Sequence, residues 1–485
     1  MNQPDLPQTI PNWIDGRASG PLKGETLAKF SPATGKEMCR VARSRSADVS
    51  SAIDAAANAF PAWSDQTAAA RGDLLMAITH GMRRHRDEIA AMIAAETGMS
   101  VKAALAETAG AVVLGEFMAG EGRRLYGRTT TSATPHRHAM TVREPLGVAG
   151  LIIAANTPIA NVAWKVFPAL ICGNTAVLKA AEDTPGTAWW FGRIAHEAGL
   201  PPGVLNIVQG LGEEAGAPLV ADARVPVVSF TGSTAVGREI ARIAGSRLAR
   251  VSLELGGKNP LLVCDDADLE HAAQWTILSA FSNAGQRCAA GSRIIVFNAV
   301  YENFRNMLLE RTRRLKVGPG NEDDLGPVIN AEQLGNMLAA VERARQGGAT
   351  ALTGGHRMDD PDHAAGYYMA PTIIENAAPD AEISVSELFG PVTCLYRVSG
   401  FDEALRLANR SPYGLTACIH TRSVHRALEF TRRVQAGVAV VNAGTFGSEP
   451  HMPFGGLKQS GYGKDMSLYA LEDYTVVRHV MVKFG

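Results

Sequence analysis

Between about residue 146 and residue 255, short apolar segments alternate with amphipathic segments at regular intervals. The apolar segments have the length and composition of buried strands and cover residues 148–155, 175–179, 204–210, 225–233 and 251–255. The segments between them have the apolar spacing of helices, at about 164–170, 187–198, 213–221 and 237–244. Strands of this kind are covered by helices on both faces, so the alternation predicts an α/β fold with a parallel sheet.

The flanking segments are predicted from the same kind of spacing. Residues 1–50 consist of extended pieces and turns, with a hairpin signal at Trp13–Gly16, and residues 51–122 have helical spacing. Residues 123–144 are rich in Thr, Ser and basic residues and predict an excursion with one or two strands. A second alternation begins after residue 260, with helices at about 267–282, 300–315 and 331–347 and a strand at 293–297.

The last segment, residues 474–484, alternates apolar and polar positions as a strand does. No partner strand is apparent after it in the sequence. Two interpretations stay open: the strand pairs with the sheet of another subunit, or it is an edge strand within its own chain.

Composition and charge exclude several classes of protein. With 485 residues, 46% of them hydrophobic, the chain is long enough for two or three globular domains. The formal net charge of −1 gives no electrostatic reason to expect nucleic acid or an anionic membrane as a partner. Six cysteines without regular spacing do not form a disulfide framework. The N-terminus lacks a signal pattern and no run reaches the length of a membrane span, so we expect a cytoplasmic protein.

Candidate site residues follow or end several of the predicted parallel strands. They are Asn156, Lys179, Gly210, Thr231–Gly232 and Glu254. Parallel sheets bind ligands at the carboxyl ends of their strands, so we expect these residues to lie along one edge of the sheet.

Cys288 stands in the segment NAGQRCAAG, between glycines and small residues that leave room for a substrate. A cysteine is mostly protonated at neutral pH, so a nucleophilic role needs a base or a favourable field, and Glu254 is the candidate base. The alternative is a small buried thiol without a chemical role.

Another candidate site is the segment SFTGSTAVG (229–237), which joins a strand to a helix through a turn at Gly232–Ser233. Free N–H groups at the start of a helix can take a phosphate. The segment matches neither of the common phosphate-binding fingerprints, so an ordinary strand–turn–helix connection stays an alternative.

Taken together, these segments resemble the aldehyde dehydrogenase superfamily over nearly the whole chain. The motifs that carry the resemblance are ANTP around Asn156, KAAE at 179–182, FTGSTAVG at 230–237, ELGGKNP at 254–260, GQRC at 285–288, ELFGPV at 387–392, NRSPYGL at 409–415 and PFGGLKQSGYG at 453–463. Each motif is modest by itself, but their common order and spacing are specific to the family.

The resemblance implies a fold and a division into domains. It implies a Rossmann-type cofactor domain at residues 1–122 and 145–255 and an α/β catalytic domain at 256–450. It further implies a small β oligomerisation arm at 123–144, with the C-terminal strand at 451–485, and a homodimer or homotetramer.

The resemblance also implies the chemistry. Cys288 attacks the aldehyde carbonyl, and the Asn156 amide and the Cys288 backbone N–H hold the resulting oxyanion. After hydride transfer to NAD a thioester remains on the sulfur, and Glu254 activates the water that hydrolyses it. Glu254 argues against a relative that passes the acyl group to coenzyme A. The presence of Cys288, Glu254 and Asn156 together argues against a catalytically inactive scaffold protein on this fold.

The family's cofactor contacts map onto a larger set of residues. They are Lys179, Glu182, Gly212, Phe230, Thr231, Gly232, Ser233, Leu255, Glu387 and Phe389, with Lys165 near the same edge. Glu182 accepts a hydrogen bond from a free ribose 2′-hydroxyl and repels a 2′-phosphate, so NAD is expected, with NADP possible. No metal is expected, since His136 and His138 lack a suitably spaced third ligand.

The sequence departs from the family before and after the catalytic asparagine, where Ala154, Ala155 and Thr157 replace the usual bulkier residues. This loss of bulk predicts a tunnel for a bulky or aromatic aldehyde. The tail 460–483 resembles that of γ-aminobutyraldehyde dehydrogenases, so an aminoaldehyde or a semialdehyde is the alternative. The tunnel candidates by motif position are Arg287, Trp164, Glu449, His451 and Phe454; Glu449 would meet an amino group and Arg287 a carboxylate.

Overall fold

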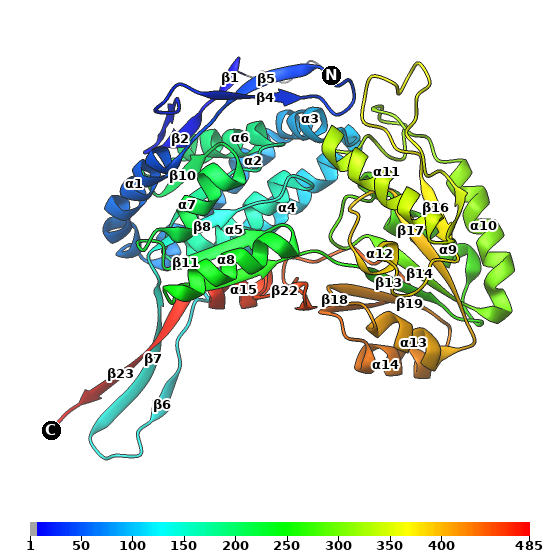
Figure 1. Ribbon diagram of the computed structural model, residues 1–485. Coiled ribbons are helices and arrows are strands. Elements are labelled where there is room, and N and C mark those ends of the chain that lie inside the picture. The colour runs from blue at the N-terminus through cyan, green and yellow to red at the C-terminus, as the bar shows by residue number, and fades with distance from the viewer. Residues whose placement is uncertain (1–6) are drawn as a thin grey trace.

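The computed structural model describes residues 7–485 and contains two large sheets and a small sheet that projects from the first (Figure 1). The centre of the first large sheet is parallel and consists, in spatial order, of β12 (Arg250–Glu254), β11 (Val227–Thr231), β8 (Val148–Ile152), β9 (Thr175–Lys179) and β10 (Leu205–Val208). These are the strands expected from the apolar segments, and nearly all their residues are buried. The fold class is therefore confirmed.

The first sheet is mixed and not purely parallel, which corrects the expectation. Antiparallel pairings add β2 (Asn12–Ile14) and β3 (Arg17–Ser19) at one side and β22 (Gly461–Tyr462) at the other. The chain reverses between β2 and β3 through Asp15 and Gly16, both with positive φ, as the hairpin signal predicted. These short strands come from the two ends of the chain, where the apolar pattern is too brief to show pairing.

Helices cover both faces of this sheet. One face carries α1 (Ser46–Ser64), α7 (Ala217–Ala221) and α8 (Thr234–Ser246), and the other carries α5 (Pro158–Ile171) and α6 (Pro185–Glu197). Alternate side chains of β8 enter the two cores, with Leu151 on the α5 side and Ile152 on the α8 side. α5 begins with Pro158 at its first position, where a missing N–H costs nothing.

A further helical layer packs on α5 and α6. It consists of α2 (Ala68–Arg84), α3 (Arg86–Thr97) and α4 (Val101–Glu121). Among the described residues α4 alone is long and apolar enough to cross a membrane by length and composition. It packs against α2, α3 and α5, as a core helix does.

The second large sheet lies beside the first (Figure 1). Its strands, in spatial order, are β15 (Thr350–Thr353), β16 (Thr372–Glu375), β17 (Val392–Val398), β14 (Gly291–Phe297), β13 (Asn259–Val263), β19 (Thr416–His420) and β20 (Val438–Val441), and all but β15 are parallel. Its helices are α9 (Leu269–Phe281), α10 (Tyr301–Arg313), α11 (Ala331–Gln346), α12 (Glu382–Val385), α13 (Phe401–Asn409) and α14 (Val424–Arg433).

The projecting sheet settles one of the open questions about the C-terminal strand. β23 (Thr475–Lys483) pairs antiparallel with β7 (Arg137–Pro145), which pairs with β6 (Thr129–Thr131). The partner strand thus lies earlier in the same chain, in the excursion at 123–144. The outer edge of β23 carries no further strand among the described residues, and the oligomeric state stays a prediction.

Smaller elements complete the fold. They are β1 (Thr9–Ile10), β4 (Thr26–Phe30), β5 (Glu37–Ala42), β18 (Tyr413–Gly414), β21 (Leu457–Lys458) and α15 (Ser467–Asp473). The two large sheets use residues 12–254 and 259–441 respectively, apart from β22. The domain boundaries given above stay predictions.

Candidate active site

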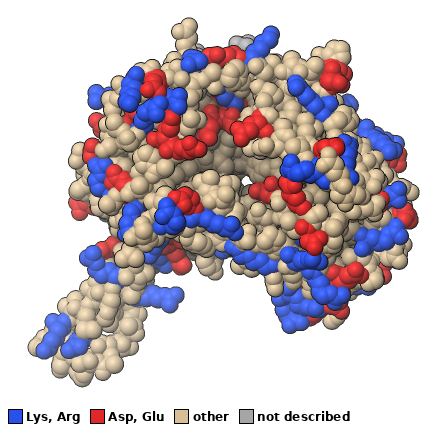
Figure 2. Space-filling model, viewed as in Figure 1, with Lys and Arg blue, Asp and Glu red and all other residues tan. Residues whose placement is uncertain are grey.

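A cavity of about 340 Å³ lies where the two large sheets meet. It brings together many of the predicted site residues: Asn156, Thr231, Gly232, Ser233, Glu254, Leu255, Cys288, Glu387 and Phe389. The space-filling view shows the molecule hollowed between its two bodies, with acidic side chains gathered along the upper wall of the hollow (Figure 2).

The register of the strands explains why these residues meet. In the first sheet Ile152 pairs with Phe230, and Thr231 pairs with Glu254, so the carboxyl ends of β8, β11 and β12 lie at one edge. In the second sheet the cavity residues precede their strands: Cys288 comes before β14 and Glu387 before β17. The site therefore joins the carboxyl edge of one parallel sheet to the amino edge of the other.

The cysteine loop makes a tight left-handed turn. Asn283, Ala284 and Gly285 all have positive φ, and a Cβ at Gly285 would lie 2.1 Å from the Gly390 carbonyl oxygen. Only glycine fits there, because both the backbone angle and the close approach exclude a side chain. The turn leads directly into Cys288.

Two amide side chains tie the cysteine loop to its surroundings. The Gln286 side chain accepts from the Ile329 N–H at 2.9 Å and donates to the Pro327 carbonyl at 3.3 Å. Asn259 Nδ2 donates to the Cys288 carbonyl oxygen at 2.7 Å. Sequence reasoning did not single out these two residues, although both stand in the quoted motifs GQRC and ELGGKNP.

Asn156 is bonded reciprocally to the same loop. Its Nδ2 donates to the Gln286 carbonyl at 3.0 Å, and Asn283 Nδ2 donates to the Asn156 carbonyl at 3.0 Å. An amide nitrogen carries two hydrogens, so one donor of Asn156 remains for a ligand in the cavity. The Asn156 amide is thereby fixed beside Cys288.

The electrostatic surroundings of Cys288 do not favour a thiolate. Burial raises the pKa of the Cys288 thiol to about 12, and the nearby carboxyl groups of Glu387 and Glu254 raise it further. The Ala289 N–H and the Arg287 guanidinium oppose this rise. The field of the protein by itself thus keeps Cys288 protonated.

Glu254 is a buried carboxyl group without a hydrogen-bond partner among the described residues. Burial raises its pKa well above the ordinary value, and the neighbouring Asp465 raises it further, while Lys165 lowers it. An unpartnered buried carboxyl is free to receive a proton from a molecule in the cavity, which is what a general base must do.

Lys165 lies behind the cavity and does not line it. Its Nζ contacts Asp465 Oδ2 at 3.1 Å and donates to Ser229 Oγ at 2.9 Å, and the side chain is fully buried. Lys165 is near enough to the edge that carries Glu254 to lower the pKa of that carboxyl group, and it pairs with the buried Asp465.

Replacing Lys165 by methionine is expected to lower the free energy of unfolding by about 3–5 kcal/mol, because Asp465 would keep an uncompensated buried charge. Urea unfolding followed by circular dichroism measures the change. The double variant Lys165→Met, Asp465→Leu removes both charges and is expected to recover part of the loss. Equal urea midpoints of unfolding for Lys165→Met and the native protein would contradict this role of Lys165.

On the first-sheet side, the cavity is bounded by the start of α8. Ser233 caps this helix, its Oγ accepting from the Val236 N–H, and a Cβ at Gly232 would lie 2.4 Å from the Phe230 ring. Phe230 thus packs beneath the turn and does not line the cavity. Opposite, Glu387 accepts from the Gly257 N–H at 2.9 Å, and burial raises its pKa to about 7.

A second cavity of about 500 Å³ adjoins the first, since Asp183, Ile329 and Asn330 line both. Glu182 lines the second cavity, and Lys179 Nζ donates to Glu182 Oε2 at 2.7 Å. Gly212 begins a π-helical turn and lines neither cavity. The helix N-terminus, the Lys179–Glu182 pair and the two adjoining cavities fit an extended cofactor with a phosphate and a ribose.

The tunnel candidates divide into three groups. Trp164 and Phe454 line the first cavity, with ring centroids 5.4 Å apart. Glu449 and His451 are exposed, with Glu449 Oε2 3.0 Å from His451 Nε2. Arg287 lies over the Phe446 ring, with Cζ 5.1 Å from its centroid.

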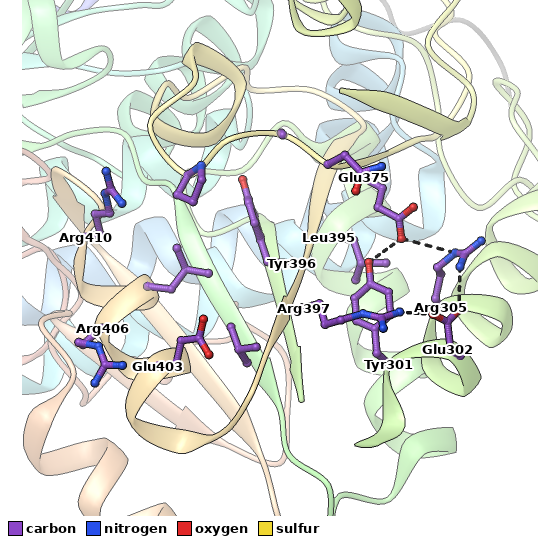
Figure 3. A pocket seen from close by; sticks show the side chains of 15 residues that line it. Tyr301, Glu302, Arg305, Glu375, Leu395, Tyr396, Arg397, Glu403, Arg406 and Arg410 are labelled. Atoms are coloured by element: carbon purple, nitrogen blue, oxygen red, sulfur yellow. Dashed lines mark hydrogen bonds and ion pairs between the residues drawn. The ribbon is translucent and has the colours of Figure 1, made fainter. Parts of the chain in front are cut away.

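A cavity of about 800 Å³, larger than these two, lies elsewhere, at the carboxyl ends of β16 and β17 (Figure 3). On one side of this cavity Arg305 contacts Glu302 at 2.8 Å and Glu375 at 3.6 Å, and the Tyr301 hydroxyl donates to Glu375 at 2.6 Å. None of the predicted site residues lines it. Within residues 7–485 no group of three His, Cys, Asp or Glu side chains is placed to hold a metal ion.

Comparison with known proteins agrees with this geometry. The model of the aldehyde dehydrogenase family matches residues 21–480. The chain belongs to the aldehyde dehydrogenase family. It is 38% identical to an alpha-ketoglutaric semialdehyde dehydrogenase of Bacillus subtilis over 97% of this chain and 96% of that protein. It is 37% identical to a mitochondrial benzaldehyde dehydrogenase of Antirrhinum majus, over 96% and 88% respectively.

Solved aldehyde dehydrogenase structures share the whole fold. Betaine aldehyde dehydrogenase from Staphylococcus aureus, in complex with NAD+, is 32% identical, with a TM-score of 0.96 over 98% of this chain and 94% of that one. The expected enzyme class, an oxidoreductase of the aldehyde dehydrogenase family, is thus confirmed.

Proposed function

We propose that this aldehyde dehydrogenase oxidises an aldehyde to its carboxylic acid with NAD, using Cys288, Asn156 and Glu254. The observation that carries the proposal is that these three side chains line one cavity between the two sheets, beside the start of α8. Bound NAD+ would supply a positively charged ring and an acceptor for the aldehyde hydrogen as hydride. Thr231–Ser233, Leu255, Glu387 and Phe389 line the cavity where it would be held.

Cys288 forms the bond to the substrate. The Cys288 thiol gives its proton to water, its sulfur adds to the aldehyde carbon, and the carbonyl oxygen becomes an oxyanion. The free N–H of the Asn156 amide and the Cys288 backbone N–H stabilise this oxyanion; one such donor contributes about 2.7–4 kcal/mol in the transition state. Loss of the aldehyde hydrogen as hydride then leaves a thioester on Cys288.

Glu254 completes the reaction. Its carboxylate removes a proton from water as the water oxygen attacks the thioester carbon, and the carbon–sulfur bond then breaks to release the acid and the Cys288 thiol. A base in this position consumes the thioester by hydrolysis, so a relative that transfers the acyl group to coenzyme A is disfavoured.

Small side chains support a wide entrance for the substrate. Ala154, Ala155 and Thr157 line the cavity at the position of the family's bulkier residues, and Trp164 and Phe454 give it an aromatic wall. A bulky or aromatic aldehyde is therefore favoured. Relatives of this chain include a benzaldehyde dehydrogenase and a semialdehyde dehydrogenase, and a semialdehyde or an aminoaldehyde is the alternative.

Glu182 supports the choice of NAD over NADP. The variant Glu182→Ala is expected to raise the ratio of kcat/KM with NADP to kcat/KM with NAD about tenfold, because it removes a negative charge that would face the 2′-phosphate. Glu197→Ala, on the outer surface of α6, is the control. A ratio that stays constant in Glu182→Ala would exclude this role.

The proposed function is tested by mixing the protein with aromatic, aliphatic, amino and carboxy aldehydes and either cofactor. The reduced cofactor is followed by its absorbance and the acid by mass spectrometry. We expect reduction of NAD with stoichiometric acid. Coenzyme A thioester in place of acid would contradict hydrolysis, and no reduction with any aldehyde would contradict the proposal.

A further inference from the structure

We propose that Asn161 is a specificity-determining residue whose side-chain oxygen accepts a hydrogen bond from a hydroxyl group of the substrate, so the preferred substrate is a hydroxyl-bearing aromatic aldehyde. This inference rests on the proposed function and names its substrate class. Asn161 belongs to α5 and lines the cavity that contains Cys288 and Asn156.

Hydrogen bonds at the first turn of α5 fix the orientation of the Asn161 amide. Its Nδ2 donates to the Thr157 carbonyl oxygen at 2.9 Å and to the Thr157 hydroxyl oxygen at 3.0 Å. An amide nitrogen has two hydrogens, and both are used here. A flipped amide would set its oxygen against the Thr157 carbonyl oxygen, and two acceptors repel each other. The side-chain oxygen therefore points away from Thr157 and keeps its lone pairs.

This oxygen is a buried acceptor without a donor. Asn161 is only 1% exposed, and no N–H or O–H group within residues 7–485 donates to its Oδ1. Buried side-chain polar atoms nearly always have a hydrogen-bond partner, so an exception in a folded protein requires an explanation. Because Asn161 lies in the wall of the cavity that contains the nucleophile, a donor group of the substrate supplies that explanation.

The position of Asn161 sets the separation between the aldehyde group and the donor. Asn156 binds the aldehyde oxygen, and Asn161 lies one helical turn beyond Thr157, about 6 Å farther along the axis of α5. Trp164, three residues after Asn161, lies on the same side of the helix, and its ring centroid is 5.4 Å from that of Phe454. An aromatic ring of the substrate packs against this wall and separates its hydroxyl from its aldehyde group.

A hydroxyl group fits this acceptor better than a charged group does. Asp183, Glu254 and Glu387 line the cavity, and no Lys or Arg in the described part of the chain does, so no cation there compensates a carboxylate on the substrate. An ammonium group carries a charge and three N–H donors, and one neutral oxygen satisfies only one of them. A hydroxyl carries one donor and no charge, and a single amide oxygen satisfies it.

The test compares aromatic aldehydes that differ in one hydroxyl group, at slightly acidic pH, where a phenol keeps its proton. The probes are 3- and 4-hydroxybenzaldehyde, each paired with its methyl analogue, and 4-aminobutanal as the ammonium probe. For the better-placed hydroxyl, wild type is expected to prefer the hydroxy to the methyl aldehyde about 10-fold in kcat/KM, because the methyl group leaves the Asn161 oxygen without a donor. Asn161→Leu is expected to abolish or reverse this preference, mainly through KM.

The ratio of the two kcat/KM values within one variant does not depend on the fraction of active protein, so it separates recognition from damage to the fold. Asn161→Asp keeps an acceptor and is expected to keep a preference for the hydroxy aldehyde. Asn58→Leu, the same substitution at an exposed position of α1, is the matched control and should keep the wild-type ratio. If Asn161→Leu does not fold, Asn161→Ala decides in its place.

An unchanged hydroxy-to-methyl ratio in Asn161→Leu overturns the inference. A wild-type enzyme that prefers 4-aminobutanal to both hydroxy aldehydes overturns it as well, because the donor would then be an ammonium group. Oxidation of hydroxy and methyl aldehydes without preference sinks only this inference, whereas no reduction of NAD with any aldehyde sinks the proposed function.

Discussion

Cys288→Ala is expected to lower the rate of NAD reduction with any aldehyde by at least about 10,000-fold. The sulfur supplies the only covalent attachment of the proposed mechanism, and removal of a nucleophile in such a set abolishes most of the catalysis. The cavity should survive, because alanine is smaller and the loop is held through Gln286 and the Cys288 carbonyl. Initial rates with saturating aldehyde measure the loss of NAD reduction. Intact-protein mass after a quench measures the loss of the covalent adduct.

Cys39→Ala is the control for thiol loss. Cys39 is a buried cysteine of β5 outside both adjoining cavities, and its pKa is raised to about 11 by burial. This variant should keep the wild-type rate and the substrate-derived mass adduct. An adduct that persists in Cys288→Ala would place the nucleophile elsewhere.

Glu254→Gln is expected to reduce about one NAD per subunit in a rapid burst and then to turn over about 100- to 10,000-fold more slowly than wild type. The burst remains because hydride transfer precedes the hydrolysis that needs the base, and general base catalysis contributes a factor of this size. Stopped-flow absorbance gives the burst amplitude, and mass spectrometry gives the accumulated thioester. Loss of the burst along with turnover would assign Glu254 to the first half of the reaction.

The pH profile distinguishes this role from a structural one. Glu254 acts as a base only when deprotonated, and burial and Asp465 raise its pKa. Steady-state turnover of wild type should therefore increase as pH rises from neutral to alkaline values, whereas the slow turnover of Glu254→Gln should lack this dependence. A wild-type rate that falls over the same interval would contradict the assignment.

Much of the fold follows from local properties of the sequence. Strands such as β8 and β9 are buried on both faces, so their apolar runs mark them without reference to the rest of the chain. The turn at Gly232–Ser233 marks the start of α8 because a Ser cap satisfies the first N–H groups of a helix. The pairing of β23 with β7 was not visible, since pairing depends on residues more than 300 positions away.

The identities of Cys288, Asn156 and Glu254 as candidates also came from the sequence, through their motifs. The surroundings of these three residues could not be predicted from the sequence. The sequence placed Lys165 near the edge that carries Glu254, but it did not show that the side chain pairs with Asp465, 300 positions later. Likewise the sequence did not show that, of the tunnel candidates, Trp164 and Phe454 line the cavity while Arg287 lies over the Phe446 ring.

The sequence by itself therefore determined the order of strands and helices and the chemical groups available for catalysis, because these depend on neighbouring residues. Only the tertiary structure decided the protonation of those groups and the charge that faces a substrate. Burial and Coulomb interactions depend on every group within a few ångströms, and at Cys288 those groups include Glu254 and Glu387, which the fold brings to the cysteine loop from distant parts of the chain.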